Sequence, residues 1–279
     1  MQPVTAADLG TDFVLIDHPR PKVARVTLNR PERMNSMAFD VMVPLKEALQ
    51  QVSYDNSVRV VVLTGAGRGF SSGADHKSAG PVPHVDGLTR PGYGLRSMEL
   101  LDDVILTLRR MHQPVIAAVN GAAIGGGLCL ALAADIRVAA SGAYFRAAGI
   151  NNGLTASELG LSYLLPRAIG ASRAFEIMLT GRDVAAGEAE RIGLVSRVVE
   201  QDELLPACYE MAERIAAFSR PGVELTKRTL WSGLEAGSLD GHMQAEGLGQ
   251  LYVRLLTGNF EEAVAARAEN RPPVFTDDK

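Results

Sequence analysis

The sequence is short of cysteine, of aromatic residues and of long apolar runs. Its two cysteines, Cys129 and Cys208, are too few for a disulfide framework, and no Cys/His cluster has the spacing of a zinc site. The sequence contains no run of about 18 apolar residues, so no membrane span is predicted. Residues 1–12 lack the basic and apolar regions of a signal peptide. We therefore expect a cytoplasmic protein with no metal site and no membrane partner.

The charges are too evenly spread for a nucleic-acid-binding protein. The net charge is −4, and the two signs are mixed along the chain with no basic stripe or aromatic platform. Apolar residues make up 47% and charged residues 22% of the 279 residues, which is enough for a sizeable core. We expect one large domain, with or without an appendage.

Strand-like and helix-like segments alternate along most of the chain. Apolar, β-branched runs predict strands over residues 13–18, 23–29 and 58–64. A helical face over residues 39–52 follows Ser36, which we expect to cap that helix. Further helices are predicted over residues 95–111, 172–180, 185–192, 202–218, 224–233, 244–256 and 260–269. The alternation predicts an α/β protein with a largely parallel sheet.

Residues 114–127 are the most informative stretch. They read as an apolar strand, a turn and a second short apolar piece that ends in three glycines, Gly125 to Gly127. The eight residues that follow have almost no polar face, so they predict a buried helix. The N-terminus of that helix would place free N–H groups and positive dipole character inside the protein. This pattern is typical of a site that stabilises an oxyanion.

A second glycine-rich turn, over residues 65–75, follows a buried strand. Its spacing matches neither the dinucleotide fingerprint nor the P-loop, so nucleotide binding is disfavoured. We expect instead that a ligand approaches the backbone closely, with N–H donors near Gly73 and Ala74. The long loop over residues 78–94, rich in Gly and Pro, is the kind of loop that often serves function.

With these segments placed, the chain resembles the crotonase (enoyl-CoA hydratase/isomerase) superfamily from about Phe13 to Phe275. Its motifs follow the order found in that family. They are residues 28–35, similar to a coenzyme A loop; 69–75 and 114–127, similar to the two oxyanion-hole segments; and 179–182, 189–195 and 260–267.

The resemblance implies a spiral core of β-β-α turns over residues 1–205 and a C-terminal helical segment over residues 206–279 that forms trimers or dimers of trimers. It implies an enzyme of fatty-acid metabolism that acts on acyl-CoA thioesters. Coenzyme A is then part of the substrate, and no separate cofactor is expected. The thioester oxygen would accept hydrogen bonds from the N–H groups of Ala74 and Gly126, each contributing on the order of 3 kcal/mol to transition-state stabilisation. The residues expected to bind substrate are Arg33, Met34, Ser72, Ala74, Asp75, His76, Lys77, Gly126 and Cys129.

The chain departs from the hydratase pattern of the family at both catalytic positions. Hydratases carry one glutamate two residues after the glycine triplet and a second just after the next strand; here these positions are Cys129 and Gly149. Glu158, eight residues before Pro166, lies in the segment where the isomerases of the family carry their base. Moving a double bond needs only one such base. The sequence therefore favours isomerisation with Glu158 as the base.

Several alternatives stay open at this point. Glu158 could merely complement the dipole in the first turn of a helix that begins near Ser157. Cys129 could be a nucleophile near a helix N-terminus or, as we favour, a small buried apolar residue. We read Asp75 as a residue that organises the backbone. The chain could also be a hydratase with a non-standard site, or an acyl-CoA-binding protein without catalysis.

Overall fold

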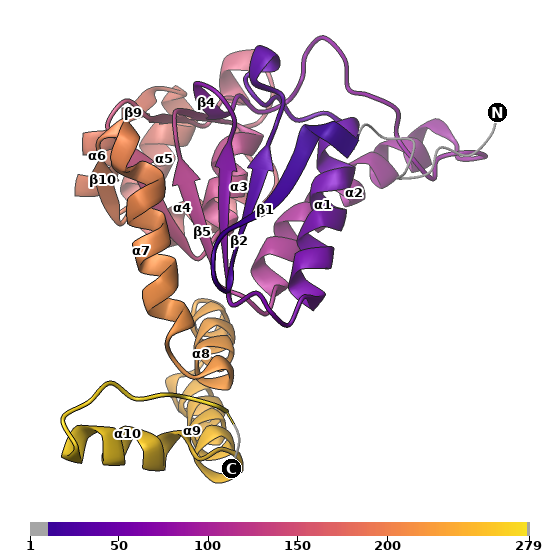
Figure 1. The fold of residues 1–279 in the computed structure, drawn as a ribbon. Helices are drawn as coiled ribbons and strands as arrows, with labels where there is room; N and C mark the ends of the chain where they lie inside the picture. The colour runs from indigo at the N-terminus through magenta and orange to yellow at the C-terminus, as the bar shows by residue number, and fades with distance from the viewer. Residues whose placement is uncertain (1–10, 278–279) are drawn as a thin grey trace.

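Two sheets form the centre of the computed structural model, which describes residues 11–277 (Figure 1). The larger sheet has the strand order β1 (Val14–Arg20), β2 (Val23–Leu28), β3 (Val60–Gly65), β5 (Val115–Val119), β7 (Ile136–Ala140) and β10 (Arg197–Val199). The smaller sheet has the order β4 (Gly69–Ser71), β6 (Ala122–Ile124), β8 (Tyr144–Arg146) and β9 (Asp183–Ala185). Among the strand pairs within residues 11–277, only β1–β2 and β8–β9 are antiparallel.

The chain winds through the two sheets as a spiral. Strands β3, β5 and β7 lie in the larger sheet, and each is followed by a strand of the smaller sheet, β4, β6 and β8. Helices complete the turns: α2 (Arg90–Arg110), α3 (Gly126–Ala133) and α4 (Leu161–Ile169). The expected α/β spiral of β-β-α turns is confirmed.

Helices cover both faces of the larger sheet, which explains its apolar strands. One set of strand residues, Val61, Leu63 and Ala117 among them, packs in the main core with α1 (Phe39–Tyr54), α2 and α3. The alternate set, such as Val62 and Ile116, packs against α7 (Leu204–Ala216). All six residues of β3 are therefore buried, as in other parallel sheets with two covered faces.

Most of the predicted helices are confirmed, including α5 (Ala171–Thr180) and α6 (Ala186–Arg191). Two local predictions are wrong. Helix α1 begins at Phe39 after Ala38, without a side-chain cap, and the Ser36 hydroxyl donates instead to Asp75 at 3.1 Å. The helix expected near Ser157 begins only at Leu161. The signal-peptide expectation for residues 1–12 falls almost entirely outside the described residues.

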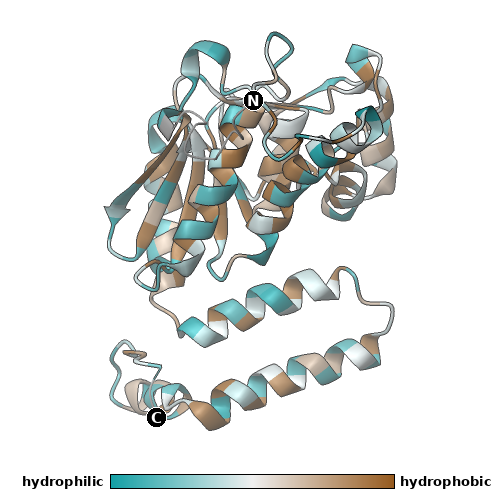
Figure 2. Cartoon of the chain, turned by 90° about the vertical axis from the view of Figure 1, so that its right-hand side faces the viewer, coloured by the Kyte–Doolittle hydropathy of each residue, from teal (hydrophilic) through white to brown (hydrophobic). Residues whose placement is uncertain are grey.

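Three helices form a separate layer beneath the sheets, which we call the arm: α8 (Arg220–Gly233), α9 (Leu239–Leu256) and α10 (Asn259–Ala268) (Figures 1 and 2). None of the 18 residues of α9 is buried. Its apolar residues Leu248, Leu251, Tyr252 and Leu255 follow helical spacing and are all exposed. Among residues 11–277, no helix is long and apolar enough to cross a membrane.

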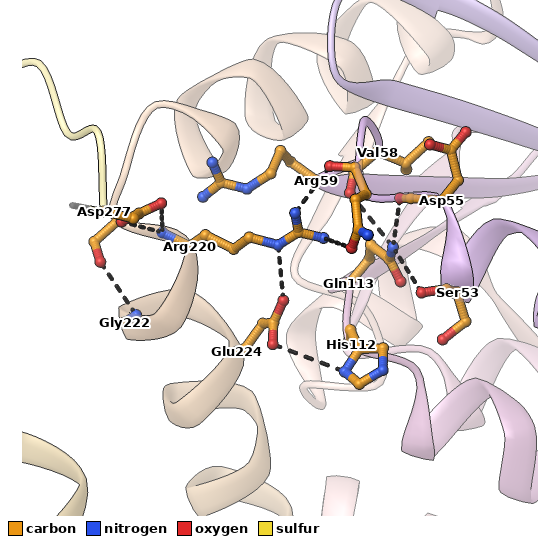
Figure 3. A network of polar contacts seen from close by, with 12 residues as sticks. Ser53, Asp55, Val58, Arg59, His112, Gln113, Arg220, Gly222, Glu224 and Asp277 are labelled. Atoms are coloured by element: carbon orange, nitrogen blue, oxygen red, sulfur yellow. Dashed lines mark hydrogen bonds and ion pairs between the residues drawn. The ribbon is translucent and has the colours of Figure 1, made fainter. Parts of the chain in front are cut away.

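Polar contacts fasten the first helix of the arm to the core (Figure 3). The Arg220 guanidinium donates to the Asn56 carbonyl at 2.8 Å and to Glu224 at 3.1 Å, and Glu224 lies 3.7 Å from His112. Deeper in the junction, Lys227 pairs with Asp135 at 3.0 Å, and its side chain is only 4% exposed. The Trp231 indole N–H donates to the same carboxylate at 2.6 Å. A largely apolar hollow of about 790 Å³ adjoins this ion pair between α8 and the core.

Candidate active site

The two glycine-rich segments of the sequence meet at one place. A Cβ atom on Gly73 would lie 2.5 Å from the carbonyl oxygen of Ile124 and 3.3 Å from the nitrogen of Gly126. A Cβ atom on Gly127 would lie 2.3 Å from the carbonyl oxygen of Ser71. Gly73 also has φ +77°, a conformation that favours glycine. The backbones can approach this closely only because the side chains are absent.

This approach brings two unpaired N–H groups together. Met37 N–H donates to the Gly73 carbonyl at 2.7 Å, and Asp75 N–H donates to the Met37 carbonyl at 3.0 Å. The N–H of Ala74 lies between these two bonds and has no acceptor within residues 11–277. Gly126 is the first residue of α3, so its N–H has no partner in its own helix. All eight residues of α3 are buried, which keeps water from weakening its dipole.

Asp75 holds the segment that carries Ala74. Its side chain is 2% exposed and accepts hydrogen bonds from Arg33 at 2.5 and 2.7 Å and from the N–H groups of Lys77 and Ser78. Burial alone would raise the pKa of this carboxyl, but these hydrogen bonds and that of Ser36 outweigh it, and the pKa falls to about 2. These contacts fit the role of a residue that organises the backbone.

The loop before α1 is fastened to the same segment. Buried Asn35 donates to the carbonyls of Ala66 and Gly69 at 2.9 and 2.8 Å, and Ser72 N–H donates to the Met34 carbonyl at 2.9 Å. Met34 is left-handed, with φ +54°. The candidate substrate residues Arg33, Met34, Ser72, Asp75, His76 and Lys77 are thus brought onto two adjoining loops. His76 and Lys77 are exposed.

The Glu158 side chain lies next to the same glycine segment, at Gly125. One of its carboxylate oxygens lies 3.1 Å from the position that a Cβ atom on Gly125 would take. The side chain is half-buried, and this burial raises the pKa of Glu158, although the nearby His76 works against the rise. Glu158 lies in the loop before α4, so the expectation that it sits in the first turn of a helix is wrong.

Neither of the two positions where hydratases carry a glutamate holds a carboxylate here. Cys129 is fully buried in α3, and burial together with the charge of Glu158 raises the pKa of its thiol well above the usual range. The thiolate needed for a nucleophile is therefore disfavoured. A Cβ atom on Gly149 would lie 1.9 Å from the Thr155 carbonyl oxygen, so no side chain fits there. Among residues 11–277, no group of three or more His, Cys, Asp or Glu side chains could hold a metal ion.

Two residues that the sequence did not single out shape the same site. A Cβ atom on Gly126 would lie 2.5 Å from the Met37 sulfur and 3.4 Å from Cδ1 of Leu159. Both side chains are apolar and buried, and they flank the start of α3. Apolar side chains give no sign of a chemical role in a sequence. Met37 and Leu159 could have been found only because one follows the motif of residues 28–35 and the other follows Glu158.

The fold and this convergence of backbone donors define a class of protein. A family model described as enoyl-CoA hydratase/isomerase matches residues 20–278, so the chain belongs to the enoyl-CoA hydratase/isomerase family, whose fold is the crotonase fold. Members of this family act on acyl-CoA thioesters.

Individual relatives are similar over nearly the whole chain. The "Probable enoyl-CoA hydratase echA12" of Mycobacterium bovis is 85% identical and covers 95% of this chain and 93% of its own length. A crystal structure of a probable enoyl-CoA hydratase/isomerase from Mycobacterium abscessus is 72% identical, with a TM-score of 0.93 over 96% of this chain and 100% of that one. A structure of a monofunctional enoyl CoA isomerase from M. smegmatis is 71% identical, with a TM-score of 0.72 over 84% of this chain and 99% of that one.

Proposed function

We propose that the chain is an enoyl-CoA isomerase of fatty-acid metabolism, which moves a double bond from C3–C4 to C2–C3 of an acyl-CoA thioester. One observation carries the proposal: the Glu158 carboxylate lies beside Gly125, next to the free N–H of Gly126, whereas neither hydratase position holds a carboxylate. The site therefore contains a single candidate base next to the place for a thioester oxygen.

The proposed reaction needs only this base and the two donors. Glu158 takes a proton from C2, and the electrons of the broken C–H bond pass to the thioester oxygen. The N–H groups of Ala74 and Gly126 stabilise the resulting dienolate, as preorganised donors do for developing oxyanions. The same carboxyl group then returns the proton to C4, so no proton is gained or lost overall.

Hydration is the second candidate, because the 85% identical relative is named a probable hydratase. It requires one group that activates water and one that protonates the α-carbon. Cys129 is a buried thiol with a raised pKa, and Gly149 has no room for a side chain. The M. smegmatis protein described as a monofunctional isomerase, at 71% identity, supports isomerisation.

Coenzyme A would lie along the two fastened loops. We propose that Arg33, Met34, Ser72, His76 and Lys77 border its path, since these residues lie on the two hydrogen-bonded loops, one of which carries Ala74. Asp75 would act indirectly by holding Arg33 and the backbone of Lys77.

Replacing Glu158 by glutamine tests the base. Glutamine keeps the size of the side chain but cannot accept the C2 proton, so we expect kcat for a 3-enoyl-CoA ester to fall by about 10²- to 10⁴-fold. Spectrophotometric turnover of 3-enoyl- and 2-enoyl-CoA esters measures this, with Glu200→Gln, remote from the site, as control. Unchanged turnover in Glu158→Gln would refute the base. Tight ester binding without turnover by the native protein would indicate a silent binding protein.

The pH profile gives a second test of Glu158. The base must be ionised to accept a proton, so kcat/KM should rise with pH through the pKa of the free enzyme. Burial raises that pKa, and we expect the acid limb to lie above the value of about 4.3 for an ordinary glutamate. A limb at or below that value would contradict a half-buried base.

A further inference from the structure

Cys129 is hydrogen-bonded to both Gly125 and Glu158. The N–H of Cys129 donates to the carbonyl of Gly125 at 3.1 Å, and the thiol of Cys129 donates to the carbonyl of Glu158 at an S–O distance of 3.5 Å. The Glu158 carboxylate lies 3.1 Å from the position that a Cβ atom on Gly125 would take. The thiol hydrogen bond therefore ties the loop that carries the candidate base to the first turn of α3, close to the Gly126 donor.

The loop needs such an anchor because its backbone is strained. Leu159 has φ +46° and Gly160 has φ +79°, two left-handed residues in succession. A left-handed leucine costs of the order of 1–3 kcal/mol and persists only where the surroundings hold it. On one side lies α3, with the Cys129 thiol bond and with Leu159 Cδ1 placed 3.4 Å from where a Cβ atom on Gly126 would be. On the other side lies the first turn of α4, where Leu161 N–H donates to the Glu158 carbonyl at 2.7 Å.

The thiol is suited to this contact in its protonated form. Burial raises the pKa of Cys129, so the S–H group is present as a donor at neutral pH. A hydroxyl at this position would also donate, whereas a methyl group would not. The ionisable groups that face Glu158 are His76, from the loop after β4, and Cys129 itself.

We propose that Cys129 is a positioning residue, which holds Glu158 over the thioester by a hydrogen bond from its thiol to the Glu158 backbone. The position where hydratases carry a glutamate would thus serve to aim the base of an isomerase. This inference rests on the proposed isomerisation. The competing view is that Cys129 only fills space, as Cys208 does in α7, where it is equally buried.

Four variants separate these views: Cys129→Ala and Cys129→Val remove the donor, Cys129→Ser keeps it, and Cys208→Ala is the matched control. We expect Cys129→Ala to lower kcat by about tenfold, since small displacements of a catalytic group are costly, while KM stays within about twofold. The acid limb of kcat/KM should move to lower pH, because a displaced carboxylate becomes better solvated. Cys129→Ser should retain native kcat within about threefold and the native limb. Cys208→Ala should leave kcat unchanged.

Equal loss in Cys129→Ser and Cys129→Ala, or native kcat in both donor-free variants, would overturn the proposal. If Cys129→Ala does not fold, Cys129→Val takes its place, since valine fills the buried space without donating. These results differ from failure of the proposed function, which would appear as absent isomerisation in the native enzyme or as full activity in Glu158→Gln.

Discussion

Helices α3 and α9 are both rich in apolar residues, yet they have opposite surroundings. All eight residues of α3 are buried, and its N-terminus faces the paired glycine segments. None of the 18 residues of α9 is buried, and its apolar stripe through Leu248, Leu251 and Leu255 is open. A single chain therefore buries the helix at the candidate site completely, but it does not cover the apolar face of α9 in the arm.

The difference also separates two kinds of glycine. At Gly73 and Gly127 a Cβ atom would collide with backbone, so these residues permit the contact between two segments. At Gly247 and Gly249 in α9, nothing lies within 4 Å of the Cβ position. Glycine in the core is thus a requirement of packing, whereas glycine in α9 meets no constraint from its own chain.

Among the substitutions that test this comparison of α3 with α9, Gly73→Ala should have the largest effect. The new Cβ would push against the Ile124 carbonyl and separate the two donors, so we expect kcat to fall by about 10²- to 10³-fold, as when an oxyanion-hole donor is lost. Gly247→Ala is the matched control and should leave kcat unchanged. The measurement is turnover of a 3-enoyl-CoA ester, with circular dichroism to confirm folding. Equal kcat in both variants would mean that the glycine contact does not serve catalysis.

Replacing Lys227 by methionine tests how α8 is joined to the core. Methionine leaves the Asp135 carboxylate without its cation, and loss of one member of a buried pair costs about 3 kcal/mol or more. We expect the free energy of unfolding in urea to fall by about that amount. Lys46→Met removes a more exposed pair with Asp103 and should cost less than about 1 kcal/mol. A similar small loss for Lys227→Met would show that the arm is held mainly by apolar contacts.

Leu251→Asp tests whether another copy of the chain covers the arm, as we expect of a trimer or a dimer of trimers. A leucine buried in an interface contributes about 2 kcal/mol, and a charge there weakens association further. We expect sedimentation velocity to show a trimer or a dimer of trimers for the native protein and smaller species for the variant. Glu246→Gln, on the same helix, should leave the oligomer intact. A monomeric native protein would contradict the idea that another copy of the chain covers the apolar stripe of α9.

The sequence predicted the parts of the site that depend on local pattern. The glycines of residues 65–75 and 125–127 signalled close backbone approach, and the structure places Gly73 against Ile124 and Gly126. The strands and most helices follow from their apolar periodicity in the same way. These features could be predicted because each is encoded within a few neighbouring residues.

The sequence failed where distant contacts decide the conformation. Ser36 was predicted to cap α1, but a carboxylate 39 residues away takes its hydroxyl. The segment around Glu158 was predicted to be helical, but contacts with α3 hold Leu159 in a left-handed conformation that its type rarely adopts. The exposure of α9 could not be predicted either, since its periodicity predicts an apolar face but not whether another part of the chain covers that face.

The tight closure of the loop over Gly149 limits how the site can change over evolutionary time. A glutamate at position 149 would collide with Thr155, and a glutamate at position 129 would bury a charge inside α3. We therefore expect each substitution alone to destabilise this chain as its loop now stands. Position 129 and residues 149–158 therefore behave as one structural unit, and we expect that a second carboxylate can be introduced only by changing the helix position and the loop together.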